Sequence, residues 1–303
     1  MTICIAARTE GVVVLISDRM ITAGDIEFEP PVTKVLGITR SIALMYSGDS
    51  ALHAEIVQEL YVDIQERLRT DPDSWLKVRD VANWYAKYWT QAKLRRAEIE
   101  VLAPLGLTRS TFLEQAGRLE PRIADKLLAD LGSYRIPSLE VIVAGVDLRF
   151  GFAVPSIYRV SDGYLMCEDQ TAFVAIGSGG RHAESQFMLA KYSGGVPNAE
   201  ALLLAYSAKR NAEIAPGVGA ETDIFVIGPG VGVSSELSSA LKAKVEVEYK
   251  KILASDARSR TRGRAEVTRF LSELSKQVPQ SQQPPRTAGT AIGAAATNTD
   301  ASK

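Results

Sequence analysis

The opening of the chain decides the fold. Residues 2–19 read TICIAARTEGVVVLISDR, in which two apolar, β-prone runs flank a turn. The runs are Ile3–Ala7 and Val12–Ser17, and Thr9-Glu10-Gly11 between them supplies a turn with a glycine. Two short apolar runs joined in this way are typical of a β-hairpin. We therefore expect paired strands at the start of the chain.

A second strand pair follows before any helix. Val32–Ile38 and Ser41–Ser47 are β-prone and come after a polar loop that contains Pro30-Pro31. Four strands ahead of the first helix exclude a βαβ opening. Gly48-Asp49-Ser50 then breaks the pattern, and Asp49 or Ser50 is suited to cap a helix.

Two helices are predicted next. The first has a leucine or isoleucine at every fourth position from Leu52 to Leu68, which gives one apolar face, and it should stop near Asp71-Pro72. The second runs from about residue 73 to residue 99, with aromatic side chains between Trp75 and Trp89. We expect these aromatic residues to pack in the core rather than to form a ligand site.

The second half of the chain repeats this order. Strands are predicted at 139–146, 152–160, 164–167 and 173–176, helices at 181–192 and 199–213 with Asn198 as a cap, and a last strand at 223–227. Two packed sheets with a helix pair on each outer face would bury all these apolar faces. The sequence thus predicts an α+β protein built as a four-layer αββα sandwich.

The remaining segments are additions to this domain, which we place at residues 2–232. Residues 100–136 form an insertion with two short helical patterns, and residues 233–277 are charged and helical in pattern. Residues 278–303 contain almost no large apolar side chains, so we expect a disordered tail.

Composition restricts the class of protein. The net charge is −1, so there is no basic excess of the kind that favours nucleic acid or an anionic membrane. The chain has no signal-peptide pattern and no apolar run of about 18 residues. We expect a soluble, cytoplasmic protein in which the two cysteines, Cys4 and Cys167, are buried free thiols.

Three residues in the opening strands could carry chemistry. Removal of Met1 would leave Thr2 with a hydroxyl nucleophile and a free α-amine, which can act as a base near neutral pH. Asp18 ends the second strand and Lys34 precedes the third. An ammonium group beside that amine would favour its neutral, basic form, and a carboxylate would hold the ammonium in place.

This pattern resembles the proteasome β-subunit and HslV-type peptidases, a family of N-terminal nucleophile hydrolases. The resemblance rests on Thr2, Asp18 and Lys34 at 16-residue spacing, on Asp18-Arg19-Met20-Ile21-Thr22, and on Ser47-Gly48-Asp49. Val143–Asp147 and Ala175–Gly180 resemble later motifs of the family. The resemblance covers about residues 2–98 and 136–230.

The resemblance implies a role for each matching residue. Thr2 would be the nucleophile and Asp18 with Lys34 the charged pair beside it. Gly48 would donate a backbone N–H to the tetrahedral oxyanion, and Ser178 would lie near the threonine amine. Gly48 and Ser178 also begin predicted helices, where glycine and serine are common, so a purely structural role remains an alternative.

One departure from the family concerns its supporting aspartate. Asn211 stands in its place, and the Ala212–Thr222 loop that follows is longer than the family's and lacks its serine. Asparagine forms hydrogen bonds but carries no charge. Glu213 or Glu221 could compensate. A further difference is that the nucleophile directly follows Met1, so we expect no long self-cleaved leader.

The resemblance implies a threonine-type endopeptidase that acts inside a ring of identical subunits. Its substrate would be a peptide or unfolded protein, and an ATPase unfoldase would be a further partner. We expect the aromatic-rich 75–89 helix to be a contact surface between the subunits of the ring. The alternatives are a catalytically silent structural subunit and an amidohydrolase acting on a small amide.

No cofactor or metal is expected. Gly177-Ser178-Gly179-Gly180 lacks the Gly-Lys-Ser/Thr ending of a nucleotide-binding loop. His53 and His182 are the only histidines, and neither has a cysteine or carboxylate at zinc-ligand spacing. No Gly-x-Ser-x-Gly elbow supports a serine hydrolase.

Overall fold

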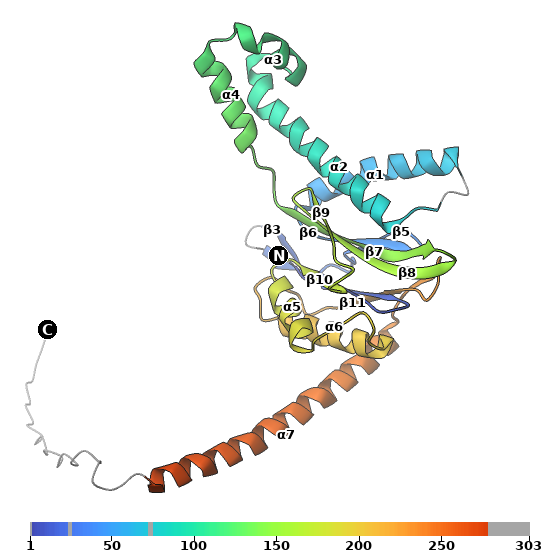
Figure 1. Ribbon diagram of the computed structural model, residues 1–303, viewed down its shortest axis with the longest axis vertical. Helices are drawn as coiled ribbons and strands as arrows, with labels where there is room; N and C mark the ends of the chain where they lie inside the picture. The colour runs from blue at the N-terminus through green and yellow to red at the C-terminus, as the bar shows by residue number, and fades with distance from the viewer. Residues whose placement is uncertain (1, 24–25, 72–74, 278–303) are drawn as a thin grey trace, which may run out of the picture. The chain divides into compact units, whose positions relative to one another are not determined.

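A computed structural model describes residues 2–23, 26–71 and 75–277. The chain divides into two compact units, residues 1–249 and residues 250–303. The first unit is a mixed α+β structure with two five-stranded antiparallel sheets (Figure 1).

The first sheet is built around the opening hairpin. Its strand order is β10-β1-β2-β11-β12. The strands are β1 (Cys4–Arg8), β2 (Val13–Ser17), β10 (Phe173–Ile176), β11 (Asp223–Ile227) and β12 (Ser234–Glu236). The predicted hairpin and the predicted strands at 173–176 and 223–227 are confirmed, whereas β12 was not expected.

The second sheet has the order β5-β6-β7-β8-β9. Its strands are β5 (Val35–Thr39), β6 (Ile42–Gly48), β7 (Leu139–Arg149), β8 (Phe152–Ser161) and β9 (Tyr164–Cys167). Alternate side chains of both sheets meet in one buried cluster that includes Cys4, Leu15, Met45 and Ile142. The two sheets therefore pack against each other, as the period-2 pattern requires.

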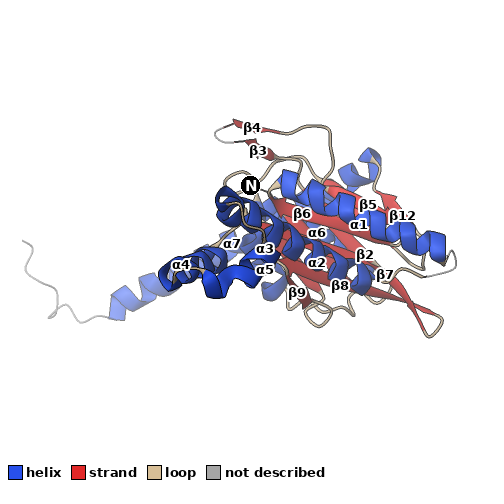
Figure 2. Cartoon of the chain, turned by 90° about the horizontal axis from the view of Figure 1, so that it is seen from above, coloured by secondary structure: helices blue, strands red, loops and turns tan. Residues whose placement is uncertain are grey.

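A separate two-stranded hairpin stands beside the sheets, formed by β3 (Ile21–Ala23) and β4 (Ile26–Phe28) (Figure 2). The sequence predicted a polar loop here, which was wrong. Ile26 and Phe28 are exposed, so the hairpin adds no apolar face to the core.

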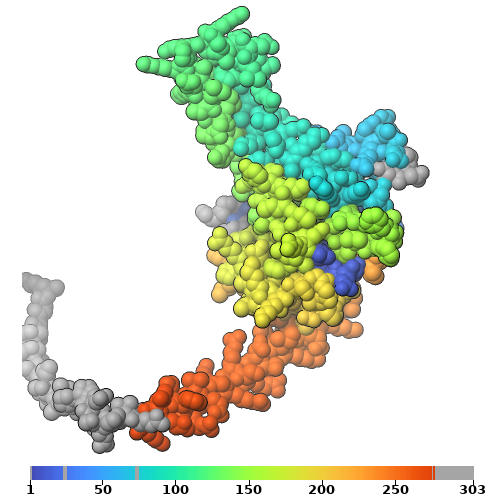
Figure 3. Space-filling view, viewed as in Figure 1, coloured from blue at the N-terminus to red at the C-terminus, as the bar shows by residue number. Residues whose placement is uncertain are grey.

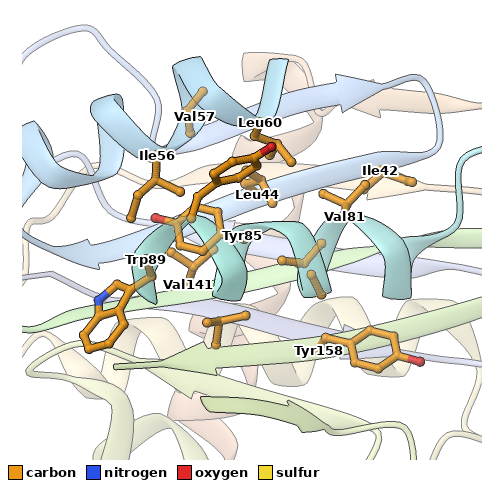
Figure 4. Close-up of a cluster of buried hydrophobic side chains, with 14 of the residues drawn as sticks. Ile42, Leu44, Ile56, Val57, Leu60, Val81, Tyr85, Trp89, Val141 and Tyr158 are labelled. Carbon is orange, nitrogen blue, oxygen red and sulfur yellow. The ribbon is translucent and has the colours of Figure 1, made fainter. Parts of the chain in front are cut away.

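Helices α1 (Ser50–Thr70) and α2 (Val78–Ala97) pack on the second sheet (Figure 4). Asp49 caps α1 by accepting a 2.6 Å hydrogen bond from the Leu52 N–H. The predicted stop of α1 is confirmed as far as Asp71; residues 72–74 lie outside the described part. α2 begins later than predicted, at Val78, whose N–H donates to Asp147 Oδ1 of β7 at 2.8 Å.

The aromatic side chains of α2 serve mainly the core. Tyr85, Tyr88 and Trp89 are buried against β7 and β8, which confirms the packing interpretation. These three rings are therefore not available to a partner, whereas Trp75 is exposed. The contact surface expected on the 75–89 helix stays a prediction.

Helices α5 (Gly180–Leu189) and α6 (Asn198–Ala212) pack on the first sheet. Figure 1 shows them on the side of the strands opposite α1 and α2. The predicted cap at Asn198 is wrong, because Pro197 is the capping residue. The Asn198 Oδ1 instead accepts a 2.7 Å hydrogen bond from Thr9 Oγ1 and so ties α6 to the first hairpin.

The insertion after α2 is a helical lobe. It contains a π-helical turn (Glu98–Leu102), α3 (Arg109–Gln115) and α4 (Pro121–Ser133), joined by short 3-10 turns at Ala103–Leu105 and Ala116–Arg118. Leu102, Phe112 and Leu127 form its own small core. Figure 3 shows this lobe, in green, projecting from the rest of the first unit.

The first unit continues past the predicted boundary at residue 232. β12 pairs with β11, and Tyr249 of α7 (Ser239–Gln277) packs edge-on against Tyr206 at 5.6 Å between ring centroids. In the second unit, the described part of α7 is exposed to solvent. The predicted disordered tail, residues 278–303, lies outside the described residues. Among the helices of residues 2–23, 26–71 and 75–277, none combines the length and the apolar character needed to cross a membrane.

The two cysteines differ in environment. Cys4 is fully buried, and burial raises the pKa of its thiol to about 12. Cys167 is exposed at the end of β9, so the prediction of two buried thiols is wrong for Cys167. Cys167 is the last residue of an edge strand, a position that the short apolar run alone does not reveal.

A buried histidine makes the stability of the fold pH-dependent. His53 stacks on Tyr46 with ring centroids 3.9 Å apart, and its Nδ1 lies 2.8 Å from the Tyr85 hydroxyl oxygen. Burial lowers the pKa of His53 from 6.5 to about 4. As the pH falls, His53 therefore takes up a proton near pH 6.5 in the unfolded chain but only near pH 4 in the folded chain. The fold loses stability as the pH falls through this window.

We expect the free energy of unfolding to fall by about 2 kcal/mol from His53 alone between about pH 7.5 and about pH 5. Urea titrations at both pH values measure it. His53→Gln should remove this part of the pH dependence, whereas exposed His182→Gln should retain it. Equal pH dependence in both variants would show that His53 is not the responsible group.

Candidate active site

The ends of four strands bring the candidate residues together. Thr2 precedes β1 and Asp18 follows β2, and the antiparallel register that pairs Cys4 with Ser17 makes them neighbours. Lys34 precedes β5 and Gly48 ends β6 in the other sheet. The site therefore lies at one end of these strands, between the two packed sheets.

The hydroxyl of Thr2 lies between two charged groups. Its Oγ1 donates to Asp18 Oδ1 at 2.5 Å and accepts a hydrogen bond from Lys34 Nζ. Lys34 Nζ also forms a 2.6 Å ion pair with Asp18 Oδ1 and donates to the Met20 carbonyl oxygen at 2.5 Å. All three side chains are buried. Low water access strengthens these electrostatic contacts.

Backbone donors fix the Asp18 carboxylate. The Ile3 N–H donates to Oδ1 at 3.1 Å, and the Gly219 N–H donates to Oδ2 at 2.9 Å. Both oxygens are thus held, and the fully buried carboxylate is compensated by the ammonium of Lys34 and by two amides. Gly219 was missed by the sequence reasoning, which noted only that the Ala212–Thr222 loop is longer than the resemblance implies.

Gly48 borders the same small cavity as Thr2 and Lys34. The cavity measures about 90 Å³ and is also lined by Tyr46 and Ser50. Gly48 has a φ of +121°, and a Cβ there would lie 2.2 Å from the Ser138 carbonyl oxygen. Any other side chain would be strained and would clash with backbone, so this position demands glycine for structural reasons too.

The Gly177-Ser178-Gly179 turn encloses the Thr2 carbonyl oxygen. Ser178 Oγ donates to the Thr2 carbonyl oxygen at 3.4 Å and to the Pro216 carbonyl oxygen at 3.1 Å. The Gly179 N–H also donates to the Thr2 carbonyl oxygen, at 3.4 Å. Gly177 approaches so closely that a Cβ would lie 2.2 Å from it. The Ser178 hydroxyl therefore contacts the backbone carbonyl of Thr2 and not the Thr2 side chain.

The structure does not bring Asn211 to the site. Its side chain is exposed on α6, and no hydrogen bond of this side chain occurs within the described ranges. Glu213 pairs with Lys209 at 2.6 Å, and Glu221 is exposed. The prediction that Asn211 takes the place of a supporting aspartate in the site is therefore wrong. The periodicity of α6 turns this position toward solvent.

The contacts of Thr2 with Asp18 and Lys34 are suited to activating a hydroxyl group. Within residues 2–23, 26–71 and 75–277, no three His, Cys, Asp or Glu side chains cluster as metal ligands. A threonine hydroxyl that is buried, hydrogen-bonded to a carboxylate and touched by an ammonium is an activated-nucleophile geometry.

Comparison with known proteins adds no assignment: no family model and no curated protein matches the chain.

Proposed function

We propose that the chain is a threonine-type peptidase of the N-terminal nucleophile class, with the four-layer αββα fold of the proteasome-like hydrolases. The observation that carries the proposal is the Thr2 hydroxyl held between Asp18 and Lys34 in a buried site. The two packed sheets and their outer helix pairs support the fold assignment.

In the proposed mechanism, Thr2 Oγ1 attacks the carbonyl carbon of a peptide bond. The hydroxyl proton passes to the α-amine of Thr2, which is free once Met1 has been removed, and then to the departing amine. The C–N bond breaks and an ester to Thr2 remains. Water attacks this ester, which releases the acid product and restores the hydroxyl.

The surrounding residues stabilise these charges. The Lys34 ammonium balances the negative charge that develops on Oγ1, and Asp18 holds Lys34 in place at 2.6 Å. The backbone at Gly48, which lines the same cavity as Thr2, is assigned to the oxyanion of the tetrahedral intermediate.

We expect Met1 to be absent from the active protein. Intact-mass measurement of the purified chain should give the mass that begins at Thr2, and a β-lactone probe should add one acyl group to that residue. The α-amine is the base in this mechanism, so a blocked amine removes it. A fully active preparation that retains Met1 would exclude the mechanism, and an inert preparation that retains Met1 would favour the silent structural subunit.

We also expect assembly into a closed ring with Thr2 facing an inner chamber. A nucleophile that cuts unfolded chains must be enclosed to spare other proteins, and closed symmetry encloses it with copies of one interface. Light scattering or electron microscopy measures this. A particle near the chain mass of 32.8 kDa that still hydrolyses peptides would contradict enclosure and favour the small-amide alternative.

A further inference from the structure

Lys209 is a fully buried lysine whose role the proposed mechanism does not explain. It lies in the last turn of α6 and has no exposed surface. Its Nζ forms a 2.6 Å ion pair with Glu213 Oε1 and donates to the carbonyl oxygens of Gly219 at 2.9 Å and Ala220 at 2.8 Å. All three donors of the ammonium are thus used inside the protein.

These contacts fold the loop after α6 back onto the site. Gly219 is held from both sides: its carbonyl oxygen accepts from Lys209, and its N–H donates to Asp18 Oδ2 at 2.9 Å. A Cβ on Gly219 would meet the Glu29 carboxylate, at 1.7 Å from Oε1, and would lie 3.0 Å from Met20 Cβ. A continuous series of hydrogen bonds therefore runs from Lys209 through Gly219 to Asp18 and from there to Thr2.

A buried ammonium group is costly when only packing is needed. Desolvation by burial lowers the pKa of Lys209, while Glu213 acts against this shift. An apolar side chain of similar length would fill the same volume without removing a charge from water. What such a side chain could not do is bind two adjacent loop carbonyls and so fix the direction of the Gly219 N–H.

We propose that Lys209 is a positioning residue that fixes the Gly219 N–H on Asp18 and thereby orients the carboxylate beside Thr2. This inference rests on the proposed peptidase function. It gives the Ala212–Thr222 loop a role in the site, because Gly219 of this loop holds Asp18 while the exposed Asn211 does not. Lys209 does not touch Thr2 itself, so its effect passes entirely through the loop.

The test compares Lys209→Met with Arg210→Met in the full-length chain. Arg210 is the matched control, because it also pairs with Glu213, at 3.2 Å, but makes no bond to Gly219 or Ala220. Each variant is measured for kcat and KM on a fluorogenic peptide amide. Hydrogen–deuterium exchange over residues 213–222 follows the loop independently of activity.

Lys209→Met should lower kcat about 100-fold with KM little changed, since a small misplacement of a reacting group costs a factor of this size. The same variant should lose exchange protection in the loop, while Arg210→Met retains both protection and kcat. Unchanged kcat in a Lys209→Met protein with an unprotected loop would overturn the positioning role. Equal losses in both variants would also overturn it.

Two further arms keep the outcomes separate. If Lys209→Met does not fold, Glu213→Gln replaces it: this variant keeps the lysine but removes its counter-ion, and it should shift kcat and loop exchange in the same direction by smaller amounts. Wild-type behaviour in Glu213→Gln would then count against the proposal. If the wild-type chain hydrolyses no peptide, the proposed function fails, and loop exchange alone decides whether Lys209 holds Gly219 on Asp18.

Discussion

Thr2→Ala should abolish peptide hydrolysis, with kcat lowered at least about 1,000-fold, because the substitution removes the nucleophilic oxygen itself. The hydroxyl is the atom that both Asp18 and Lys34 contact, and no other described side chain shares this pair of contacts. Initial rates on a fluorogenic peptide and acylation by a β-lactone probe measure the loss. The probe should leave the variant unlabelled.

Loss of activity in this variant should not come from unfolding. Asp18 keeps its ion pair with Lys34 and its bonds to the amides of Ile3 and Gly219. The removed hydroxyl accounts for hydrogen bonds worth about 1–2 kcal/mol, a small part of the stability of a domain this size. Thermal melting checks this expectation.

Thr2→Ser is the matched control for the nucleophile. It retains a hydroxyl group on the same carbon and should therefore keep measurable turnover and probe labelling. If Thr2→Ala instead turned over peptide at the wild-type rate, a different residue would perform the chemistry and the proposed function would fall.

The sequence predicted the parts of the site that lie in consecutive strands. Two apolar, β-prone runs around a glycine turn located the opening hairpin, and an antiparallel hairpin brings the residue before its first strand next to the residue after its second. Thr2 and Asp18 are such a pair, so their contact follows from the local pattern. Lys34 enters through the next strand pair, where the resemblance placed it.

The parts that the sequence did not predict depend on long-range packing. The Gly219 N–H reaches Asp18 from a loop about 200 positions away, and no local pattern specifies that approach. Asn211 was placed in the site by analogy with the family, yet the phase of α6 exposes it and buries Lys209 instead. Helix phase relative to the sheet is a tertiary property, so alignment alone misassigned the supporting residue.

Secondary-structure errors have the same origin. Asn198 looks like a helix cap by residue type, but its side chain is used by Thr9 of the first hairpin. α2 was expected to begin earlier than it does, and its first N–H, that of Val78, donates to Asp147 of a distant strand. In both cases the first residue of the helix bonds a residue far away in the sequence, and local propensity contains no information on such a contact.

Lys34→Met should lower kcat by about 100- to 1,000-fold, which is the range for a positioned proton-transfer or charge-stabilising group. Methionine fills a similar volume but provides neither the contact to Thr2 Oγ1 nor the ion pair to Asp18. Loss of the ammonium leaves the charge that develops on Oγ1 unbalanced. The measurement is kcat on the same peptide, taken well below the melting temperature.

A stability effect accompanies this variant and must be separated from catalysis. Removing one partner of a buried ion pair costs about 3 kcal/mol, here moderated by the two amides that still bind Asp18. Lys242→Met is the matched control, because Lys242 also pairs with a fully buried carboxylate, Asp223, at 3.2 Å but contacts none of the catalytic groups. It should lose stability and keep kcat. If both lysine variants lose activity in proportion to their stability, Lys34 acts on the fold alone and not on the chemistry at Thr2.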